Sequence, residues 1–259
     1  MKNQLKRKIK EGRTVLGTLV FIPSPAVIEV LGRAGFDFAV IDTEHTTISP
    51  YETAMIENMI RAAELSGITP IVRIPEPSKV MTQKVLDAGA QGVMVSGIKN
   101  KSDALKIVRD AKFPPRGERG CCSVTRPTGY SADYSEAYWE EANNEIMVIP
   151  LIETQEGVDN LEEILTVEGI DWVSFGPRDY TMSIGYTDVN NPKTLKASEH
   201  VTAVCKKHGV LVDQFVFPPY DVAVKQARDR GFNVLTAGID LSILLGALRT
   251  ISMALKNMK

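Results

Sequence analysis

The sequence predicts an α/β protein built as a (β/α)8 barrel, the TIM-barrel architecture. Short apolar runs alternate with helical segments along all 259 residues, and about eight strand–helix pairs in a chain of this size are typical of such a barrel. The runs are apolar on both faces, as expected for buried parallel strands. An open, doubly wound sheet is the main alternative, but its first strand is normally followed by a glycine-rich phosphate loop. Here that position, residues 21–25, contains no glycine.

The first half of the chain gives four strand–helix pairs. We expect strands over residues 15–21, 38–41, 69–74 and 92–95, followed by helices over residues 25–34, 50–65, 78–88 and 102–111. Ser24 and Pro25 are typical of a helix start, and Gly35, Gly67 and Gly89 end the first three helices. Residues 2–10 are basic and are expected to be the exposed face of an additional first helix.

The second half follows a segment without clear periodicity, residues 112–144, and a loop of that length inside a compact domain is usually functional. Strands are expected over residues 146–152, 172–178, 209–216 and 233–237, and helices over residues 158–167, 197–208, 220–230 and 241–255. The sequence has no repeat, low-complexity tract or Pro/Ser-rich linker. We therefore expect residues 1–259 to form a single domain.

Composition argues against several classes of function. The formal net charge of -2 gives no electrostatic reason to expect nucleic acid. No apolar run reaches membrane-spanning length, and the basic start has no apolar segment behind it, so it does not resemble a signal peptide. Of the three cysteines, Cys121 and Cys122 are adjacent, which fits no zinc-binding spacing. We expect a cytoplasmic protein with reduced thiols that binds neither nucleic acid nor membrane.

Two carboxylates follow strand-like runs in the second half. Glu153 comes directly after one run and Asp179 after the next. Ligands bind at the C-terminal ends of parallel strands, and two hard oxygen donors there suit Mg²⁺ or Mn²⁺, with Co²⁺ a further fit. Either acid alone could be a helix cap or a surface charge. The pair, with the small corner of Gly176 and Pro177 beside Asp179, favours a metal site.

Other polar side chains stand at the ends of the second and third strands. Asp42, Glu44 and His45 follow the second strand, and Arg73 stands near the end of the third. A neighbouring carboxylate would orient the His45 ring and stabilise its protonated form. Arg73 either forms a salt bridge at the barrel rim or donates to a substrate carboxylate or a developing oxyanion.

A divalent metal, an arginine and a histidine–carboxylate pair favour chemistry on a 2-oxo acid. Such an acid can chelate a metal through its carboxylate and keto oxygens, and the metal then stabilises an enolate. Arg73 could share the negative charge, and His45 could move a proton. This machinery makes or breaks a carbon–carbon bond beside a carbonyl without a Schiff base, and no lysine stands at a predicted strand end.

The same residues resemble the HpcH/HpaI family of class II pyruvate aldolases. The matching segments are residues 34–38, 42–45, 72–75, 86–92, 114–120, 152–154 and 169–179. Each segment alone is a weak signal. Their order and spacing together are specific, and the similarity extends from Gly17 to the last helix.

The resemblance implies a barrel of the phosphoenolpyruvate/pyruvate type whose divalent metal is held by Glu153 and Asp179. It implies that Arg73 contacts the pyruvyl group and that His45, assisted by Asp42, transfers a proton. The reaction would be cleavage of a 4-hydroxy-2-oxo acid, such as a 2-keto-3-deoxy sugar acid, to pyruvate and an aldehyde through a metal-stabilised enolate.

The resemblance also assigns the pyruvate carboxylate to backbone amides around Gly176, Pro177, Arg178 and Asp179. It implies a homo-oligomer, usually a hexamer arranged as a trimer of dimers that exchange the C-terminal helix. The apolar residues 243–248 are compatible with that exchange and equally with packing on the chain's own barrel.

The chain departs from the family pattern at several positions. Leu151 stands where a glutamine near the pyruvate is common, and Cys121 and Cys122 replace small residues. After the fourth strand, where a proline is common, the segment of residues 95–98 reads Val-Ser-Gly-Ile. Two alternatives therefore stay open. One is a lyase of the citrate-lyase β-subunit and malyl-coenzyme A type, and the other is a barrel that binds an oxo acid without turnover.

Overall fold

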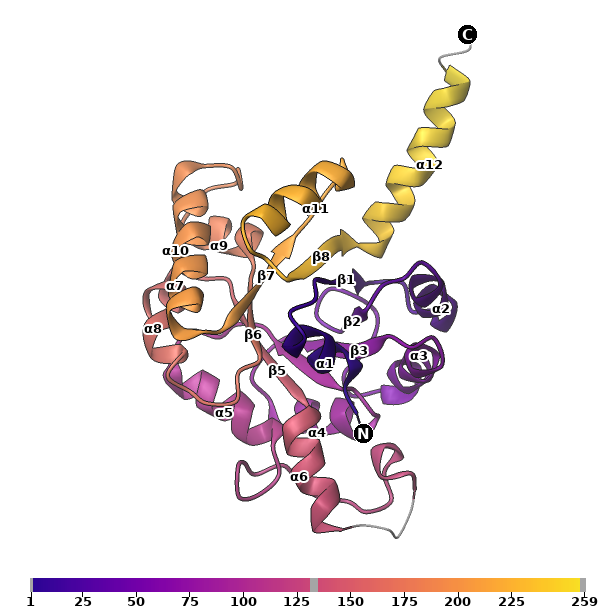
Figure 1. The fold of residues 1–259 in the computed structure, drawn as a ribbon, viewed down its shortest axis with the longest axis vertical. Coiled ribbons are helices and arrows are strands. Elements are labelled where there is room, and N and C mark those ends of the chain that lie inside the picture. Colours follow the sequence, from indigo (N-terminus) through magenta and orange to yellow (C-terminus); the bar gives the residue numbers. More distant parts are fainter. Residues whose placement is uncertain (1, 131–134, 257–259) are drawn as a thin grey trace.

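The computed structural model describes residues 2–130 and 135–256, which form a closed barrel of eight parallel strands in sequence order (Figure 1). The strands are β1 (Val15–Val20), β2 (Phe38–Asp42), β3 (Thr69–Ile74), β4 (Gly92–Val95), β5 (Met147–Ile152), β6 (Trp172–Phe175), β7 (Leu211–Phe215) and β8 (Val234–Ile239). β8 pairs with β1 and closes the barrel. The predicted TIM barrel is confirmed.

Helices surround the barrel and connect its strands (Figure 1). They are α1 (Gln4–Lys10), α2 (Pro25–Arg33), α3 (Thr53–Leu65), α4 (Lys79–Asp87), α5 (Lys101–Ala111), the 3-10 turn η1 (Arg126–Thr128), α6 (Glu136–Glu145), α7 (Gln155–Asp159), α8 (Leu161–Ile164), α9 (Pro177–Ser183), α10 (Pro192–His208), α11 (Tyr220–Asp229) and α12 (Asp240–Lys256). Across the described residues, none is long and apolar enough to cross a membrane.

Several helix boundaries differ from the prediction because local caps and tertiary contacts set them. α10 begins earlier than expected, since the Asn191 side chain accepts hydrogen bonds from the amides of Lys193 and Thr194. The single helix expected over residues 158–167 is instead the short pair α7 and α8. β6 ends at Phe175, and the residues after it open the unpredicted helix α9.

The segment expected to lack regular structure, residues 112–144, contains η1 and most of α6, while residues 131–134 lie outside the described part. The buried Lys112 ammonium donates to the carbonyls of Asn143 and Ile146 at the end of α6. These contacts come from residues distant in sequence, so local periodicity could not predict the helix. In η1, Arg126 pairs with Glu64 in the last turn of α3, which precedes β3. η1 therefore lies toward the N-terminal end of the barrel, away from the mouth.

The barrel interior is filled by alternate strand residues. The rings of Phe38 on β2 and Trp172 on β6 meet inside it with their centroids 5.7 Å apart. Gly17 on β1 makes room for them, because a Cβ atom there would lie 2.2 Å from the Phe38 ring.

Helix α1 lies against the N-terminal end of the barrel, where its Lys6 pairs with Asp171 at 2.7 Å. The basic start is therefore a helix, as expected, and some of its cations are paired.

One carboxylate stands in the barrel wall without a cation. Asp213 on β7 is 6% exposed and accepts hydrogen bonds from Ser174 Oγ at 3.1 Å and Thr236 Oγ1 at 3.2 Å. Its second oxygen is buried and has no partner among the described residues. Burial is the main reason that the pKa of Asp213 is raised to about 7.

This carboxyl should make stability fall as the pH rises. The folded protein keeps the Asp213 proton up to about pH 7, whereas an unfolded chain releases it near pH 4. The stabilising contribution of the Asp213 carboxyl to the free energy of unfolding is therefore complete below about pH 4 and is lost as the pH rises through 7. We expect Asp213→Asn to raise the free energy of unfolding at pH 8, by up to roughly 4 kcal/mol, and to change it little at pH 4.

Urea unfolding followed by circular dichroism at the two pH values measures this difference. Asp171→Asn is a matched control, because its carboxylate is paired with Lys6 and its loss should destabilise the protein at pH 8. An Asp213→Asn variant that is less stable than the parent protein at pH 8 would contradict the assignment.

Candidate active site

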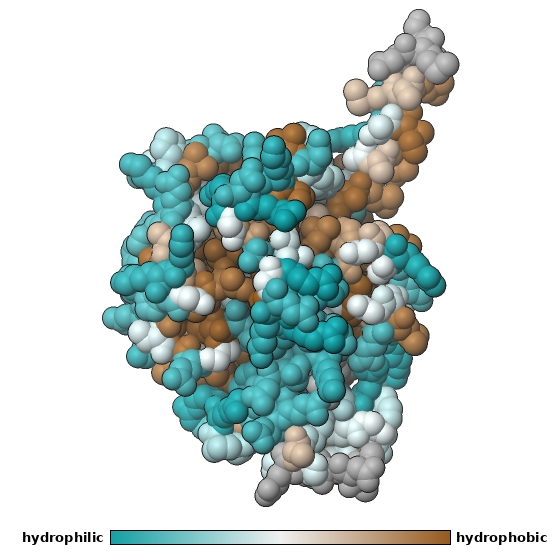
Figure 2. All heavy atoms as spheres, viewed as in Figure 1, coloured by the Kyte–Doolittle hydropathy of each residue, from teal (hydrophilic) through white to brown (hydrophobic). Residues whose placement is uncertain are grey.

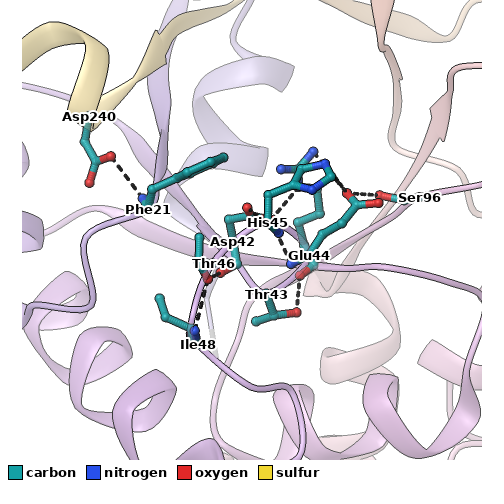
Figure 3. Close-up of polar contacts among 10 residues, drawn as sticks. Phe21, Asp42, Thr43, Glu44, His45, Thr46, Ile48, Ser96 and Asp240 are labelled. Atoms are coloured by element: carbon teal, nitrogen blue, oxygen red, sulfur yellow. Dashed lines mark hydrogen bonds and ion pairs between the residues drawn. The ribbon is translucent and has the colours of Figure 1, made fainter. Parts of the chain in front are cut away.

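The predicted polar residues come together at the C-terminal mouth of the barrel. β2 ends at Asp42, Arg73 is the second-last residue of β3, and Glu153 directly follows β5. Asp179 lies in the first turn of α9, just after β6. His45 stands in the loop after β2, and Figure 3 shows its ring beside Glu44. The barrel thus gathers side chains that are separated by more than a hundred residues in the sequence.

An ion pair between β2 and β3 forms the base of the site. Asp42 and Arg73 are register partners on these strands, and Arg73 Nε donates to Asp42 Oδ1 at 2.7 Å. The Asp42 side chain is fully buried and that of Arg73 is 9% exposed. A charge so buried needs its partner, and removing one member of such a pair typically costs about 3–5 kcal/mol.

Asp42 also shapes the loop that carries the histidine. Its two carboxylate oxygens accept the backbone amides of Glu44 and His45, each at 3.1 Å. The sequence interpretation had a neighbouring carboxylate orient the His45 ring. The structure places Asp42 on the His45 backbone, while the ring nitrogen Nε2 lies 3.7 Å from Glu44 Oε2 (Figure 3).

Glu44 is a site residue to which the sequence assigned no role. Its Oε2 atom lies 3.2 Å from Arg73 Nη1 and accepts a hydrogen bond of 2.7 Å from Ser96 Oγ at the end of β4. The available signal was its position between Asp42 and His45, directly after a strand. Its partners could not be inferred, because they come from two other strands.

Two glycines allow the backbone to enclose Glu153. The Gly97 amide donates to Glu153 Oε1 at 2.8 Å, in a turn where Gly97 has φ +72°. On the other side, a Cβ atom at Gly176 would lie 3.0 Å from the Glu153 Cβ atom. Gly97 supplies the left-handed turn from which its amide reaches the carboxylate, and the missing side chain of Gly176 leaves room for Glu153.

The charges around Glu153 are unbalanced toward negative. Partial burial is the main reason that its pKa is raised to about 7. The charges of Glu44 and Asp179 act in the same direction, and the Gly97 amide and Arg73 oppose them. A cation bound between Glu153 and the exposed Asp179 would relieve this excess, so the donor set fits a divalent metal. Among the described residues, no group of three or more His, Cys, Asp or Glu side chains is placed to hold one, so other ligands would be water or substrate.

The start of α9 offers fewer amides than the sequence interpretation assumed. The Gly176 N–H donates to Ile152 O at 2.9 Å within the barrel, and Pro177 has no N–H to offer. The amides of Arg178 and Asp179 lie in the first helical turn, where N–H groups have no partner within their own helix. The side chains of both residues are exposed.

Hydrogen bonds between α12 and the loop after β1 also hold the mouth of the barrel together. Asp240, at the start of α12, accepts a hydrogen bond of 3.0 Å from the Phe21 amide (Figure 3) and another of 3.0 Å from the Ile22 amide. This carboxylate therefore joins the end of β8 to the loop after β1.

Leu151 is 4% exposed and is one of the side chains nearest to Gly176, so the position that departs from the family pattern lies next to the site.

Comparisons with known proteins identify the family of this chain. A family model described as HpcH/HpaI aldolase/citrate lyase matches residues 18–247. A 5-keto-4-deoxy-D-glucarate aldolase from Citrobacter koseri is 28% identical over 255 residues, which cover 98% of this chain and 96% of that protein. A hydroxypyruvate/pyruvate aldolase from Paraburkholderia phytofirmans is 31% identical, with 95% of each chain covered.

A solved structure shows the same architecture. The HpcH/HpaI aldolase from Desulfitobacterium hafniense matches with a TM-score of 0.89 at 29% identity, covering 97% of this chain and 96% of that chain. The family model spans most of the sequence and includes every candidate site residue. The relatives are named as aldolases, which are lyases. The chain is therefore an enzyme of the HpcH/HpaI aldolase/citrate lyase family.

Proposed function

We propose that the protein is a divalent-metal-dependent aldolase that cleaves a 4-hydroxy-2-oxo acid, such as a 2-keto-3-deoxy sugar acid, to pyruvate and an aldehyde. The observation that carries the proposal is the meeting of two carboxylates, Glu153 and Asp179, with the immobilised guanidinium of Arg73 at one barrel mouth. Similarity to a glucarate-derived keto-acid aldolase and a hydroxypyruvate/pyruvate aldolase supports a 2-oxo acid as substrate.

Glu153 and Asp179 would hold the metal, with Mg²⁺ or Mn²⁺ the best match to two carboxylates and Co²⁺ a further fit. The bound ion would supply Lewis-acid polarisation of the 2-oxo group. The Gly97 amide keeps the Glu153 carboxylate aimed into the mouth.

Arg73 would bind the pyruvyl oxygen that becomes negative as the carbon–carbon bond breaks. Its Nε and Nη1 atoms are already oriented by Asp42 and Glu44, and such a pre-organised donor stabilises developing charge without reorganising. The first amides of α9, those of Arg178 and Asp179, would hold the substrate carboxylate.

His45 would move the proton. Its ring is held at the site by the backbone hydrogen bond to Asp42 and faces Glu44. With the side chain 54% exposed, the ring can take the proton of the substrate 4-hydroxyl as the C3–C4 bond breaks. It can then give a proton to the carbon that becomes the pyruvate methyl group, in each case directly or through water. Asp42 acts through the loop that carries His45 and through Arg73.

We also propose that the protein is a homo-oligomer, a hexamer arranged as a trimer of dimers that exchange α12. This helix projects away from the barrel (Figure 1), and apolar residues run along it (Figure 2). Leu244, Leu248 and Ile251 are 48%, 54% and 70% exposed, respectively. An apolar helix face so exposed is best explained by packing against a second copy.

The metal assignment is tested by Glu153→Gln and Asp179→Asn. Each should weaken Mn²⁺ binding, measured by electron paramagnetic resonance, by more than the roughly 10- to 100-fold that loss of an outer-shell group costs. Pyruvate release from a panel of 4-hydroxy-2-oxo acids, measured with a lactate dehydrogenase coupling, should fall in parallel. Glu156→Gln, an exposed carboxylate on the adjacent α7, is the control. Full metal-stimulated cleavage by either site variant would refute the assignment.

His45→Ala should reduce turnover far more than binding. We expect kcat for cleavage to fall by about 100-fold or more, as is typical for loss of a general acid or base, while the Mn²⁺ affinity stays within about twofold. His200→Ala, on the exposed side of α10, should behave as the parent protein. Unchanged kcat in His45→Ala would exclude its role in proton transfer.

The assembly is tested by placing charges on α12. The double substitution Leu244→Glu and Leu248→Glu should break the dimer contact, and the hexamer should give way to smaller species in light scattering coupled to gel filtration, because two charges would be buried in an apolar contact. Leu65→Glu, on the 89% exposed Leu65 of α3, should leave the assembly intact. A parent protein that is monomeric at micromolar concentration would contradict the proposal.

A further inference from the structure

Ser96 is a rigidly held hydroxyl at the mouth of the barrel. It directly follows β4, it is 1% exposed, and its amide donates to Ile74 O on β3 at 3.1 Å. Its Oγ atom donates to Glu44 Oε2 at 2.7 Å (Figure 3). A short hydroxyl side chain with its backbone fixed in the sheet has little freedom, so it holds the carboxylate in one place.

The oxygen that Ser96 holds is shared among the reacting side chains. Glu44 Oε2 also lies 3.2 Å from Arg73 Nη1 and 3.7 Å from His45 Nε2. Among the described residues, Ser96 is the only uncharged donor to this carboxylate. Without Ser96, the Glu44 carboxylate would be held only by Arg73 and by the half-exposed His45 ring, and it could move with that ring away from Arg73.

The position of Glu44 decides where the Arg73 guanidinium points. Asp42 binds its Nε edge and Glu44 binds Nη1, so the planar group is fixed at two places and Nη2 remains as the donor for a ligand. Among the described residues, Nη2 forms no hydrogen bond. If Glu44 moves away, the guanidinium keeps only its contact with Asp42 and can rotate about it. Nη2 would then no longer point at the substrate oxygen.

We propose that Ser96 is a positioning residue for the reaction, acting through Glu44 to fix Arg73 and His45 in their working geometry. The effect on rate rests on the proposed aldolase function, whereas the effect on the position of Glu44 does not. Among the described residues, the Ser96 hydroxyl donates to Glu44 and to neither Glu153 nor Asp179, so its loss should affect the chemical step more than binding.

The kinetic test uses pyruvate with Mn²⁺ and follows exchange of the methyl protons into D₂O by NMR. Ser96→Ala should lower the maximal exchange rate about five- to tenfold, because the lost hydrogen bond acts on Arg73 and His45 only through Glu44. The pyruvate KM and the Mn²⁺ affinity should stay within about twofold. Ser96→Thr, which keeps the hydroxyl, should restore most of the rate, and Ser78→Ala, at the N-cap of α4, should exchange as the parent protein does.

A double-mutant cycle distinguishes positioning from a general effect on packing. If Ser96 acts through Glu44, adding Ser96→Ala to Glu44→Gln should slow exchange by less than about twofold. An equal loss in both backgrounds, or a Ser96→Ala rate equal to that of the parent protein, would overturn the inference.

Crystal structures of Ser96→Ala and Ser96→Thr test the positioning without reference to activity. The Glu44 carboxylate should leave Arg73 Nη1 in the alanine variant and remain there in the threonine variant. A Glu44 that keeps its 3.2 Å contact with Arg73 in Ser96→Ala overturns the inference. Absence of exchange in the parent protein, with metal bound, would instead count against the aldolase function, and the structures would still decide the role of Ser96.

Discussion

The geometry of the mouth depends on the buried ion pair between Asp42 and Arg73. A fully buried carboxylate must be satisfied, and Asp42 is satisfied by one guanidinium and two backbone amides. Those contacts fix Arg73 on β3 and, at the same time, fold the loop after β2 so that Glu44 and His45 face the site. One carboxylate therefore sets the positions of Arg73, which would bind the substrate oxygen, of His45, which would move the proton, and of Glu44, which lies beside both.

The case for a divalent metal follows from an excess of negative charge at the mouth. Glu44, Glu153 and Asp179 surround a mouth in which Arg73 is the cation that acts on Glu153, and this raises the energy of the Glu153 carboxylate. A folded protein tolerates such an imbalance where a ligand corrects it. A divalent metal would balance the charge on Glu153 and Asp179, and Arg73 would remain available for the substrate.

Most of the barrel could be predicted from the sequence because parallel strands and their glycine stops leave local signals. The strand-end residues could also be predicted, since each follows an apolar run. The hydrogen-bond and ion-pair partners within the site could not be predicted from the sequence. That the Asp42 side chain holds the His45 backbone, that Glu44 faces the ring, and that Ser96 holds Glu44 all depend on how neighbouring strands align. Helix α6 was missed for the same reason, because Lys112 holds its end from a distant position in the sequence.

The most direct test of the account is the exchange of pyruvate methyl protons into D₂O by the parent protein, measured by NMR after treatment with a chelator and again after addition of Mg²⁺ or Mn²⁺. This half-reaction would require the proposed metal ligands, Glu153 and Asp179, together with Arg73, but no aldehyde. We predict exchange well above that of free metal, abolished by the chelator and restored by the ion. Exchange no faster than with free metal, in protein shown to bind Mn²⁺, would contradict enolate chemistry on pyruvate at this mouth.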